Sequence, residues 1–207
     1  MQNINKVKNP VIQHIVSMLR DISVQGDLFR SYVSELARLL LYEALKDENL
    51  HMKKINTWIG EKEFPVLNEK NLIPIAILRA GLPMLEGVLK ILKNSPAGFL
   101  AIKRDEKTLK STVYYVRLPD IEGKTVIIVD PMVATGGSLD DAIKIVKERK
   151  PKKIITLNII AAPEGIERIS KNHPDVKVYI AQIDEKLNKD GFIIPGLGDA
   201  GDRAFNT

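Results

Sequence analysis

The stretch TVIIVDPMVATGGS, residues Thr125–Ser138, determines how the rest of the chain is interpreted. Its first five residues, Thr125–Val129, are rich in β-branched side chains and are typical of a strand that is buried on both faces of a parallel sheet. They are followed by Asp130, and then by a loop of small residues that leads into an amphipathic segment beginning near Leu139. Because ligands bind outside the carboxyl ends of the strands in an open parallel sheet, we expect a binding site here.

The loop Ala134–Ser138 has the chemistry of a phosphate cradle. Its paired glycines let the backbone approach a ligand closely, and the start of the following helix presents free amides and partial positive charge. Thr135 and Ser138 add hydroxyl groups, and Asp130 can accept hydrogen bonds from sugar hydroxyls. The GxxxxGK[ST] spacing of nucleoside triphosphate loops is missing. The alternative is a plain strand-to-helix turn capped by Ser138.

From Leu72 onward, short apolar runs alternate with helical ones. The strand-like runs are LIPIAIL, AGFLAI, TVIIV, KIITLNIIAA and VKVYIA, and the helical runs include PMLEGVLKIL and SLDDAIKIVKE. Alternation of this kind predicts an α/β fold with a central, mostly parallel sheet flanked by helices. We expect a single domain over residues 1–207, with the core sheet at about residues 71–183.

The segment before this alternation is predicted to be helical over about residues 9–46. Apolar side chains repeat at helical spacing in two stripes, with Asp27 as a candidate cap of the second helix. Residues Asp47–Lys70 are polar and lysine-rich, which leaves a hairpin and an extended arm as open alternatives. Residues Arg104–Asp120 carry charge and then a β-rich run, and they are interpreted as a loop or hairpin that projects from the sheet.

The composition narrows the class of protein. The 207 residues are 44% hydrophobic and 28% charged, which is ordinary for a globular domain. No apolar run approaches the ~18 residues of a membrane span, and the chain has no signal-peptide pattern at its start, so we expect a cytoplasmic protein. The absence of cysteine excludes disulfides and thiol nucleophiles. His14, His51 and His173 share no metal-ligand spacing and are interpreted as surface or packing residues. The net charge of +5 favours an anionic partner.

Several motifs resemble one known family. VIIVDPMVATGGS is similar to the ribose-phosphate signature of phosphoribosyltransferases, and GFIIPGLGDAGDRAFNT closely resembles the base-binding tail of uracil phosphoribosyltransferases. ILRAG, KRDEKTL, AAPEGI and DEKLNKDGF match further family positions in the expected order. The resemblance covers residues from about Asn9 to Thr207, and it implies a type I phosphoribosyltransferase-like fold.

The resemblance also implies an activity. The family joins uracil to 5-phosphoribosyl 1-diphosphate (PRPP) with Mg²⁺, giving uridine monophosphate and diphosphate. It further implies a homodimer or homotetramer, and it leaves activation by GTP open. No membrane or nucleic-acid partner is expected, because the chain lacks a long apolar run and a basic run with interleaved aromatics.

The resemblance assigns residues of this chain to each substrate. Arg79 and Arg104, each after a strand, are expected to clamp the diphosphate, because a guanidinium pairs bidentately with phosphate oxygens. Asp199 is expected to face the ribose-diphosphate or its hydrated Mg²⁺. The residues assigned to PRPP are Arg79, Arg104, Asp130, Pro131, Met132, Val133, Ala134, Thr135, Gly136, Gly137, Ser138 and Asp199.

Uracil is assigned to a C-terminal loop at about residues 190–207. Ile194, Gly198, Asp199 and Ala200 are expected to match the edge of the base, which presents two carbonyl acceptors around an N–H group. Asp202 and Arg203 are interpreted as braces of this loop. No residue is nominated as a general base, and residues 104–118 are interpreted as a lid that excludes water.

Three positions depart from patterns common among relatives. Pro83 replaces a glycine, although proline is acceptable in the first turn of a helix. Lys103 replaces an aromatic residue before Arg104. Pro131 replaces a second acid found in many phosphoribosyltransferases, which fits the uracil branch. Pro83 and Lys103 bear on diphosphate binding rather than on the type of reaction.

Three alternatives stay open beside the uracil enzyme. The first is a regulator of the same fold that binds RNA, against which stand the 5% aromatic content and the lack of a basic run with interleaved aromatics. The second is an enzyme for another base, such as a purine. The third is a nucleotide-binding relative without catalysis.

Overall fold

The structure is a computed structural model that describes residues 2–104 and 111–207, without the side chains at positions 103, 104 and 111. The strands are β1 (Ile4–Lys6), β2 (Leu50–Thr57), β3 (Gly60–Leu67), β4 (Leu72–Leu78), β5 (Gly98–Arg104), β6 (Ser111–Arg117), β7 (Thr125–Val129), β8 (Met132–Val133), β9 (Lys153–Ala161), β10 (Lys177–Ile183), β11 (Lys186–Leu187) and β12 (Ile193–Ile194). The helices are α1 (Pro10–Leu19), α2 (Gly26–Ala44), the 3-10 helix η1 (Glu69–Asn71), α3 (Leu82–Ile91), α4 (Gly137–Lys147), α5 (Pro163–Asn172) and α6 (Ala200–Phe205).

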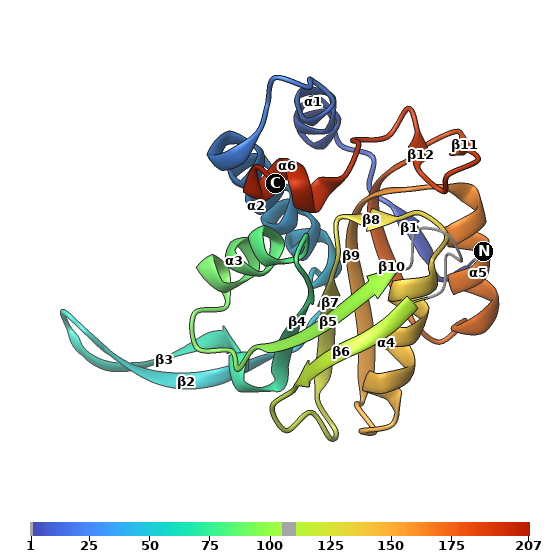
Figure 1. The fold of residues 1–207 in the computed structure, drawn as a ribbon. Coiled ribbons are helices and arrows are strands. Elements are labelled where there is room, and N and C mark those ends of the chain that lie inside the picture. The colour runs from blue at the N-terminus through green and yellow to red at the C-terminus, as the bar shows by residue number, and fades with distance from the viewer. Residues whose placement is uncertain (1, 105–110) are drawn as a thin grey trace.

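The main sheet confirms the predicted α/β class. Its strand order is β1-β10-β9-β7-β4-β5-β6, and β8 also pairs with β9 (Figure 1). The pairs are parallel except for β5 with β6, which is antiparallel. The five strand-like runs of the sequence form β4, β5, β7, β9 and β10, and these make the middle of the sheet.

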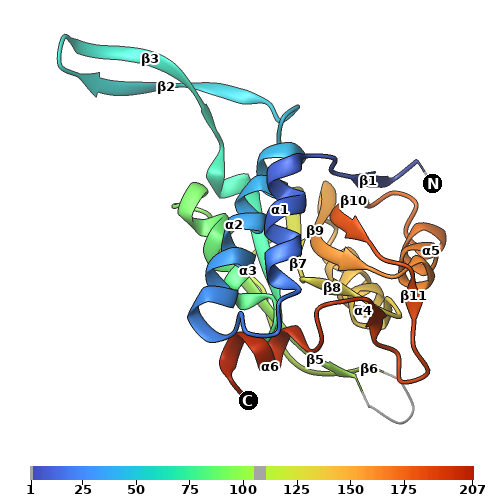
Figure 2. The ribbon, with the colours of Figure 1, turned by 90° about the horizontal axis from the view of Figure 1, so that it is seen from above.

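Helices cover both faces of this sheet (Figure 2). Helices α1, α2 and α3 pack on one face and contribute to a core that includes Ile127 and Val129. Helices α4 and α5 pack on the other face, in a core that includes Val126 and Ile128. Alternate side chains of β7 therefore enter opposite cores, which explains why this strand is apolar at every position.

The chain reverses its direction of travel across the sheet between β4 and β7. It moves from β4 through α3 to β5, whereas from β7 it moves through α4 to β9 and then through α5 to β10. The crevice between strands that lead in opposite directions is where open α/β sheets bind ligands. Arg79 directly follows β4 and Asp130 directly follows β7, so both lie at this crevice.

Two hairpins resolve alternatives that the sequence leaves open. Strands β2 and β3 pair over their full length and project from the body, so the segment Asp47–Lys70 is a hairpin (Figures 1 and 2). Its tip carries Trp58, which is 96% exposed. The β-rich run after Arg104 forms β6, which pairs with β5 at the sheet edge. Residues 105–110 of the expected lid lie outside the described residues.

Some helix ends differ from the sequence prediction. Helix α2 begins at Gly26 after Gln25, so Asp27 lies in the first turn and is not the cap. Helix α4 begins at Gly137, two residues before the predicted start. Pro83 lies in the first turn of α3, as expected. Within the described part of the chain, the helices are too short or too polar to cross a membrane.

Candidate active site

The predicted phosphate cradle, Ala134–Ser138, begins directly after β8 and includes the first two residues of α4. Gly136 is the N-terminal cap of α4. Its backbone is in the left-handed region, at φ 75°, which is unfavourable for residues that carry a Cβ atom. No side chain caps the start of α4, and Ser138 lies inside its first turn. The alternative interpretation, a turn capped by Ser138, is therefore wrong about the cap. The Gly137 amide has only a long contact of 3.5 Å to Thr135 Oγ1. The cradle therefore presents backbone amides toward the cleft, where an anion can accept their hydrogen bonds.

The start of α5 packs directly against the back of the cradle. A Cβ atom added to Gly165 would lie 2.3 Å from the carbonyl oxygen of Ala134, and one added to Gly136 would lie 3.0 Å from the carbonyl oxygen of Gly165. The two backbones therefore meet without side chains between them. This close approach holds the cradle against the buried Gly165 in the first turn of α5.

A buried carboxylate, Asp140, joins α4 to α5 behind the cradle. Its Oδ2 accepts hydrogen bonds from Lys144 and Arg168, each at 2.9 Å, and its Oδ1 contacts Asn172 at 3.0 Å and His173 Nε2 at 2.8 Å. Burial opposes ionisation, but these four partners outweigh it and hold the pKa of Asp140 below its usual value. His173 is thus a packing residue, as the sequence indicates.

Asp130 is the buried acid at the floor of the cleft. Burial raises its pKa to about 7, and a hydrogen bond from the Met132 amide opposes the shift only in part. The Asp130 carbonyl oxygen accepts from Asn158 Nδ2 at 2.7 Å, and Asn158 in turn accepts from the Thr156 hydroxyl. This buried network fixes the end of β7. The Asp130 carboxyl group can accept further hydrogen bonds, which sugar hydroxyls can donate.

Arg79 stands across the cleft from the cradle and contacts the C-terminal helix. Its Nη2 donates to Asp202 Oδ1 at 2.8 Å, and its Nη1 donates to Thr207 Oγ1 at 3.3 Å. About half of the Arg79 and Asp202 side chains is exposed, so this pair contributes little to stability. The guanidinium is therefore held at the cleft wall by a weak contact that a diphosphate can replace.

The C-terminal loop forms the wall that faces the cradle. Gly196 and Gly198 adopt positive φ values of 66° and 71°, and Asp199 caps α6 by accepting from the Asp202 amide at 2.9 Å. The carbonyl oxygen of Ile194 already accepts from the Glu185 amide at 3.0 Å. Two cis peptide bonds, Leu78–Arg79 and Ile194–Pro195, precede residues of the site.

These segments enclose one cleft with a volume of about 1190 Å³. The predicted site residues that line it are Arg79, Asp130, Met132, Ala134, Thr135, Gly136, Gly137, Ser138, Gly198, Asp199 and Ala200. Pro131, Val133 and Ile194 are outside the described lining: Pro131 and Val133 are buried behind the cradle and Ile194 pairs with β11. Arg104 ends β5, and its side chain lies outside the described part of the structure.

The cleft also has lining residues that sequence reasoning missed. Tyr114 comes from β6, and Phe192 and Asp190 come from the turn before β12. Asp190 and Phe192 belong to the family-matching DEKLNKDGF motif, so a signal for them was present. Tyr114 carries no local signal, since its place at the cleft depends on how β6 pairs with β5.

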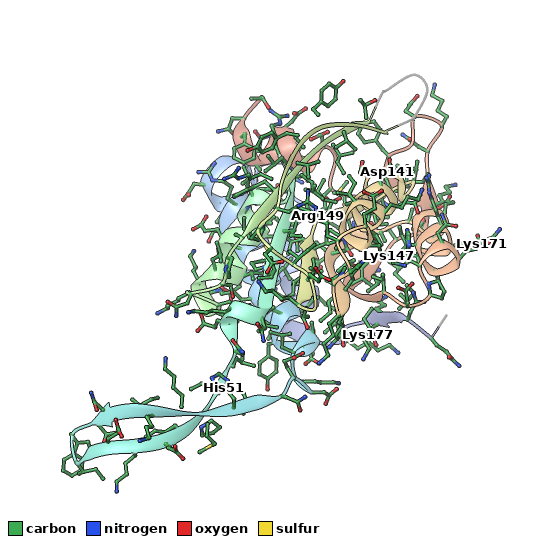
Figure 3. All side chains as sticks on the ribbon, turned by 90° about the horizontal axis from the view of Figure 1, so that it is seen from below. His51, Asp141, Lys147, Arg149, Lys171 and Lys177 are labelled. Atoms are coloured by element: carbon green, nitrogen blue, oxygen red, sulfur yellow. The ribbon has the colours of Figure 1, made fainter. Side chains whose placement is uncertain are left out.

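No histidine is among the described residues that line the cleft. His51 lies on the projecting hairpin (Figure 3), and His14 lies on the exposed side of α1. Over residues 2–104 and 111–207, no three acidic or histidine side chains gather as a metal-binding cluster. The acidic oxygens of Asp199 and Asp190 suit a hydrated Mg²⁺ that arrives with a phosphate ligand, rather than an all-protein cage.

The switch point and the cradle define the chain as a type I phosphoribosyltransferase fold. A purine phosphoribosyltransferase from Pyrococcus horikoshii matches 75% of this chain and 85% of its own at a TM-score of 0.50 and 21% identity. A hypoxanthine phosphoribosyltransferase from Staphylococcus aureus matches 76% of both chains at 0.51 and 13% identity. Likeness at such identities shows the fold alone.

The chain belongs to the uracil phosphoribosyltransferase family, whose sequence profile matches residues 6–207. A uracil phosphoribosyltransferase of Aquifex aeolicus is 46% identical over 200 residues, covering 97% of this chain and 96% of that relative. One of Dictyoglomus turgidum is 48% identical over 202 residues, covering 97% and 98%. A solved Aquifex aeolicus structure matches at a TM-score of 0.94 and 46% identity, covering 97% and 96%.

Proposed function

We propose that this protein transfers the 5-phosphoribosyl group of PRPP to uracil, giving uridine monophosphate and diphosphate. The observation that carries the proposal is that a phosphate cradle, a glycine-bearing loop, Asp130 and Arg79 all line one cleft. Relatives named uracil phosphoribosyltransferase, similar over nearly the whole chain, support the choice of base.

On this proposal, PRPP lies across the cleft from the cradle to Arg79. The amides and hydroxyls of Ala134–Ser138 bind phosphate, and Asp130 accepts from ribose hydroxyls. Pro131, Met132 and Val133 support the cradle from β8. Arg79 leaves Asp202 to pair with the diphosphate, and Arg104 supplies a second positive charge from the end of β5. A charge-assisted, bidentate pair is stronger than the exposed contact it replaces.

Uracil binds the C-terminal loop on this proposal. Its edge offers two carbonyl oxygens and an N–H, which backbone groups at Ile194 and Gly198–Ala200 match without a charged side chain. Since the loop carries two glycines at positive φ, its backbone groups can approach the base closely. Phe192, which lines the same wall and is exposed, offers an apolar surface for the ring.

Positioning and electrostatics would account for most of the rate. As diphosphate departs, positive charge develops on the ribose and negative charge on the leaving oxygens, which the cradle amides, Arg79 and Arg104 stabilise. Mg²⁺, held through the diphosphate and the Asp199 carboxylate by way of water, would supply further charge neutralisation. No residue is assigned to remove the uracil N1 proton. The lid expected over residues 104–118 would exclude water from the reactive ribose; its residues 105–110 lie outside the described part of the structure.

We further propose a homodimer or homotetramer in the cytoplasm. The exposed apolar side chains of the hairpin, including Trp58, Ile59 and Phe64, support an oligomer, because large exposed apolar patches mark contact surfaces. Light scattering after gel filtration measures the number of subunits, and a monomer would contradict this proposal. Fractionation of cells tests the location.

The deciding experiment is an assay of uridine monophosphate formation from uracil and PRPP with Mg²⁺. Cytosine, hypoxanthine and adenine are run in parallel, and one arm contains GTP because the resemblance leaves activation by GTP open. Turnover with uracil alone is the expected result. Turnover with a purine would reassign the base, and no turnover with any base, with or without GTP, would overturn the proposal.

A further inference from the structure

One ion pair holds both backbone polar groups of Gly196. The Gly196 amide donates to Asp184 Oδ2 at 3.0 Å, and Arg20 Nη1 donates to the Gly196 carbonyl oxygen at 2.9 Å. Arg20 and Asp184 also bind each other in two places, at 2.9 Å through Nη1 and at 2.7 Å through Nη2. The three residues therefore form a closed set of hydrogen bonds, which we call the Gly196 clamp.

The two charged residues of the clamp come from distant parts of the chain. Arg20 is the C-terminal cap of α1, and Asp184 directly follows β10 at the carboxyl edge of the sheet. The Asp184 side chain is 2% exposed and that of Arg20 is 27% exposed. A bidentate pair whose carboxylate is buried is stronger and more directional than a fully exposed pair.

Gly196 lies in the middle of the candidate base-binding loop. It separates Ile194 from Gly198–Ala200, which are the backbone segments expected to match the edge of the base. Its φ is 66°, and a Cβ atom there would lie 2.1 Å from the carbonyl oxygen of Ile193. The loop backbone is therefore tightly turned at Gly196, so the orientation of this one residue sets the direction of its neighbours on both sides.

We propose that Arg20 and Asp184 are positioning residues for the nucleobase, acting through Gly196 without touching the substrate. The inference rests on the proposed function. Because uracil is recognised by backbone groups, the loop must hold those groups in place before the base arrives, and preorganisation of this kind raises affinity by avoiding the cost of ordering. The cradle lies on the opposite wall, so PRPP binding does not depend on the clamp to the same degree.

The test uses the full-length enzyme with Arg20→Lys, which keeps the charge but removes the bidentate geometry. We expect the KM for uracil to rise about tenfold, the factor that loss of a charged hydrogen bond commonly produces. The KM for PRPP should change by less than about twofold, within the range of distant surface changes. Arg38→Lys is the matched control, since Arg38 pairs with Glu35 on α2. It should leave both KM values unchanged.

Asp184→Asn and the double variant show whether the pair acts as a unit. If it does, Arg20→Lys with Asp184→Asn raises the KM for uracil no further than one change alone. A purely structural role would lower the melting temperature and the active fraction while leaving the ratio of the two KM values unchanged. That unchanged ratio in Arg20→Lys would overturn the inference.

Hydrogen exchange on the wild-type protein gives a second test that does not depend on any variant folding. The Gly196 amide should exchange slowly in the substrate-free enzyme, because the clamp already holds it. Fast exchange there would contradict preorganisation. The two proposals fail in different ways: a wild-type enzyme that does not use uracil refutes the function, whereas normal uracil turnover with unaltered KM values in Arg20→Lys refutes only the clamp.

Discussion

The two walls of the cleft are built in contrasting ways. The cradle, Ala134–Ser138, is a short contiguous turn between β8 and α4, and its ligand-binding groups are backbone amides supplied by that turn. The part of the C-terminal loop between β12 and α6 is irregular, and it is held by side chains that include Arg20, which lies 176 positions from Gly196 in the chain. The cradle is therefore a product of local structure, whereas the loop depends on long-range contacts. Changes behind each wall should affect one substrate more than the other.

Crowding the back of the cradle should give the largest effect. Gly165→Ala places a Cβ atom where it would meet the Ala134 carbonyl oxygen, so α5 and the cradle must separate. Overpacking of this kind costs about 1–3 kcal/mol, and a displaced cradle should lower kcat/KM for PRPP up to about hundredfold. Steady-state kinetics measure the loss. Glu167→Ala, an exposed position on the same helix, should have no such effect, and an unchanged KM for PRPP in Gly165→Ala would show that the cradle tolerates movement.

Removing the buried carboxylate behind the cradle should give the second-largest effect. Asp140→Ala leaves His173 and Asn172 without their shared acceptor, and loss of such buried hydrogen bonds costs about 2 kcal/mol in the free energy of unfolding. Urea unfolding measures this cost, and kinetics should show a raised KM for PRPP with little change for uracil.

The neighbouring acid supplies the matched control for that experiment. Asp141 is partly exposed on α4 (Figure 3) and its carboxylate lies 3.7 Å from Lys144. Asp141→Ala should alter stability by less than about 0.5 kcal/mol, as is usual for surface changes. If both variants lose the same stability, the network around Asp140 contributes no more to stability than a partly exposed contact does.

A change behind the opposite wall should affect uracil instead. Arg203 donates to the carbonyl oxygens of Leu19, Leu197, Asp21 and Val24, and its guanidinium lies 4.6 Å from the ring centre of Phe29. A lysine side chain at position 203 cannot donate to four carbonyl groups at once. We therefore expect Arg203→Lys to raise the KM for uracil about tenfold.

Arg149→Lys is the control for that change, since Arg149 (Figure 3) lies just beyond the end of α4, and Figure 1 shows this end of α4 on the far side of the molecule from α6. It should leave both KM values as they are. If Arg203→Lys changed the KM for uracil and the KM for PRPP equally, it would contradict the prediction that each wall serves mainly one substrate.

The smallest expected effect is a dependence on pH. Burial raises the pKa of Asp130 from 3.8 to about 7, so the folded protein holds this proton more tightly than the unfolded chain does. The contribution of Asp130 to stability is therefore fully present below the unfolded pKa and is lost as the pH rises through the folded pKa. Ribose hydroxyls need the charged carboxylate as acceptor, so the KM for PRPP should fall severalfold between about pH 6 and about pH 8.

Asp130→Asn separates this ionisation from that of the substrate. The variant should lose the part of the pH dependence that belongs to Asp130, while keeping any part due to the phosphates of PRPP. Kinetics across the pH range measure both profiles. Identical profiles for the two proteins would show that Asp130 does not change its charge on binding.

The sequence predicted features that depend on local structure better than features that depend on long-range contacts. The middle strands, the cradle and the positions of Arg79 and Asp130 were predictable, because each depends on residues within one or two neighbouring elements. The start of α4 was misplaced, since Gly136 was not identified as a left-handed cap. The sequence pattern could have indicated Asp184 as a site residue, because it follows a buried strand at the carboxyl edge of the sheet, as Asp130 does. Arg20 had none, because its position at the end of α1 does not indicate what lies beside it.

The order of apolar runs and the small residues after β7 were enough to specify an α/β sheet with a glycine-bearing strand-to-helix turn at its carboxyl edge, because strand burial and tight turns follow from local pattern. The state of Asp130 and the form of the base-binding wall have another origin. Burial, which raises the pKa of Asp130, is a property of the packed molecule. The clamp on Gly196 requires α1, β10 and the C-terminal loop to meet, and only the folded chain brings residues so far apart in sequence within hydrogen-bonding distance.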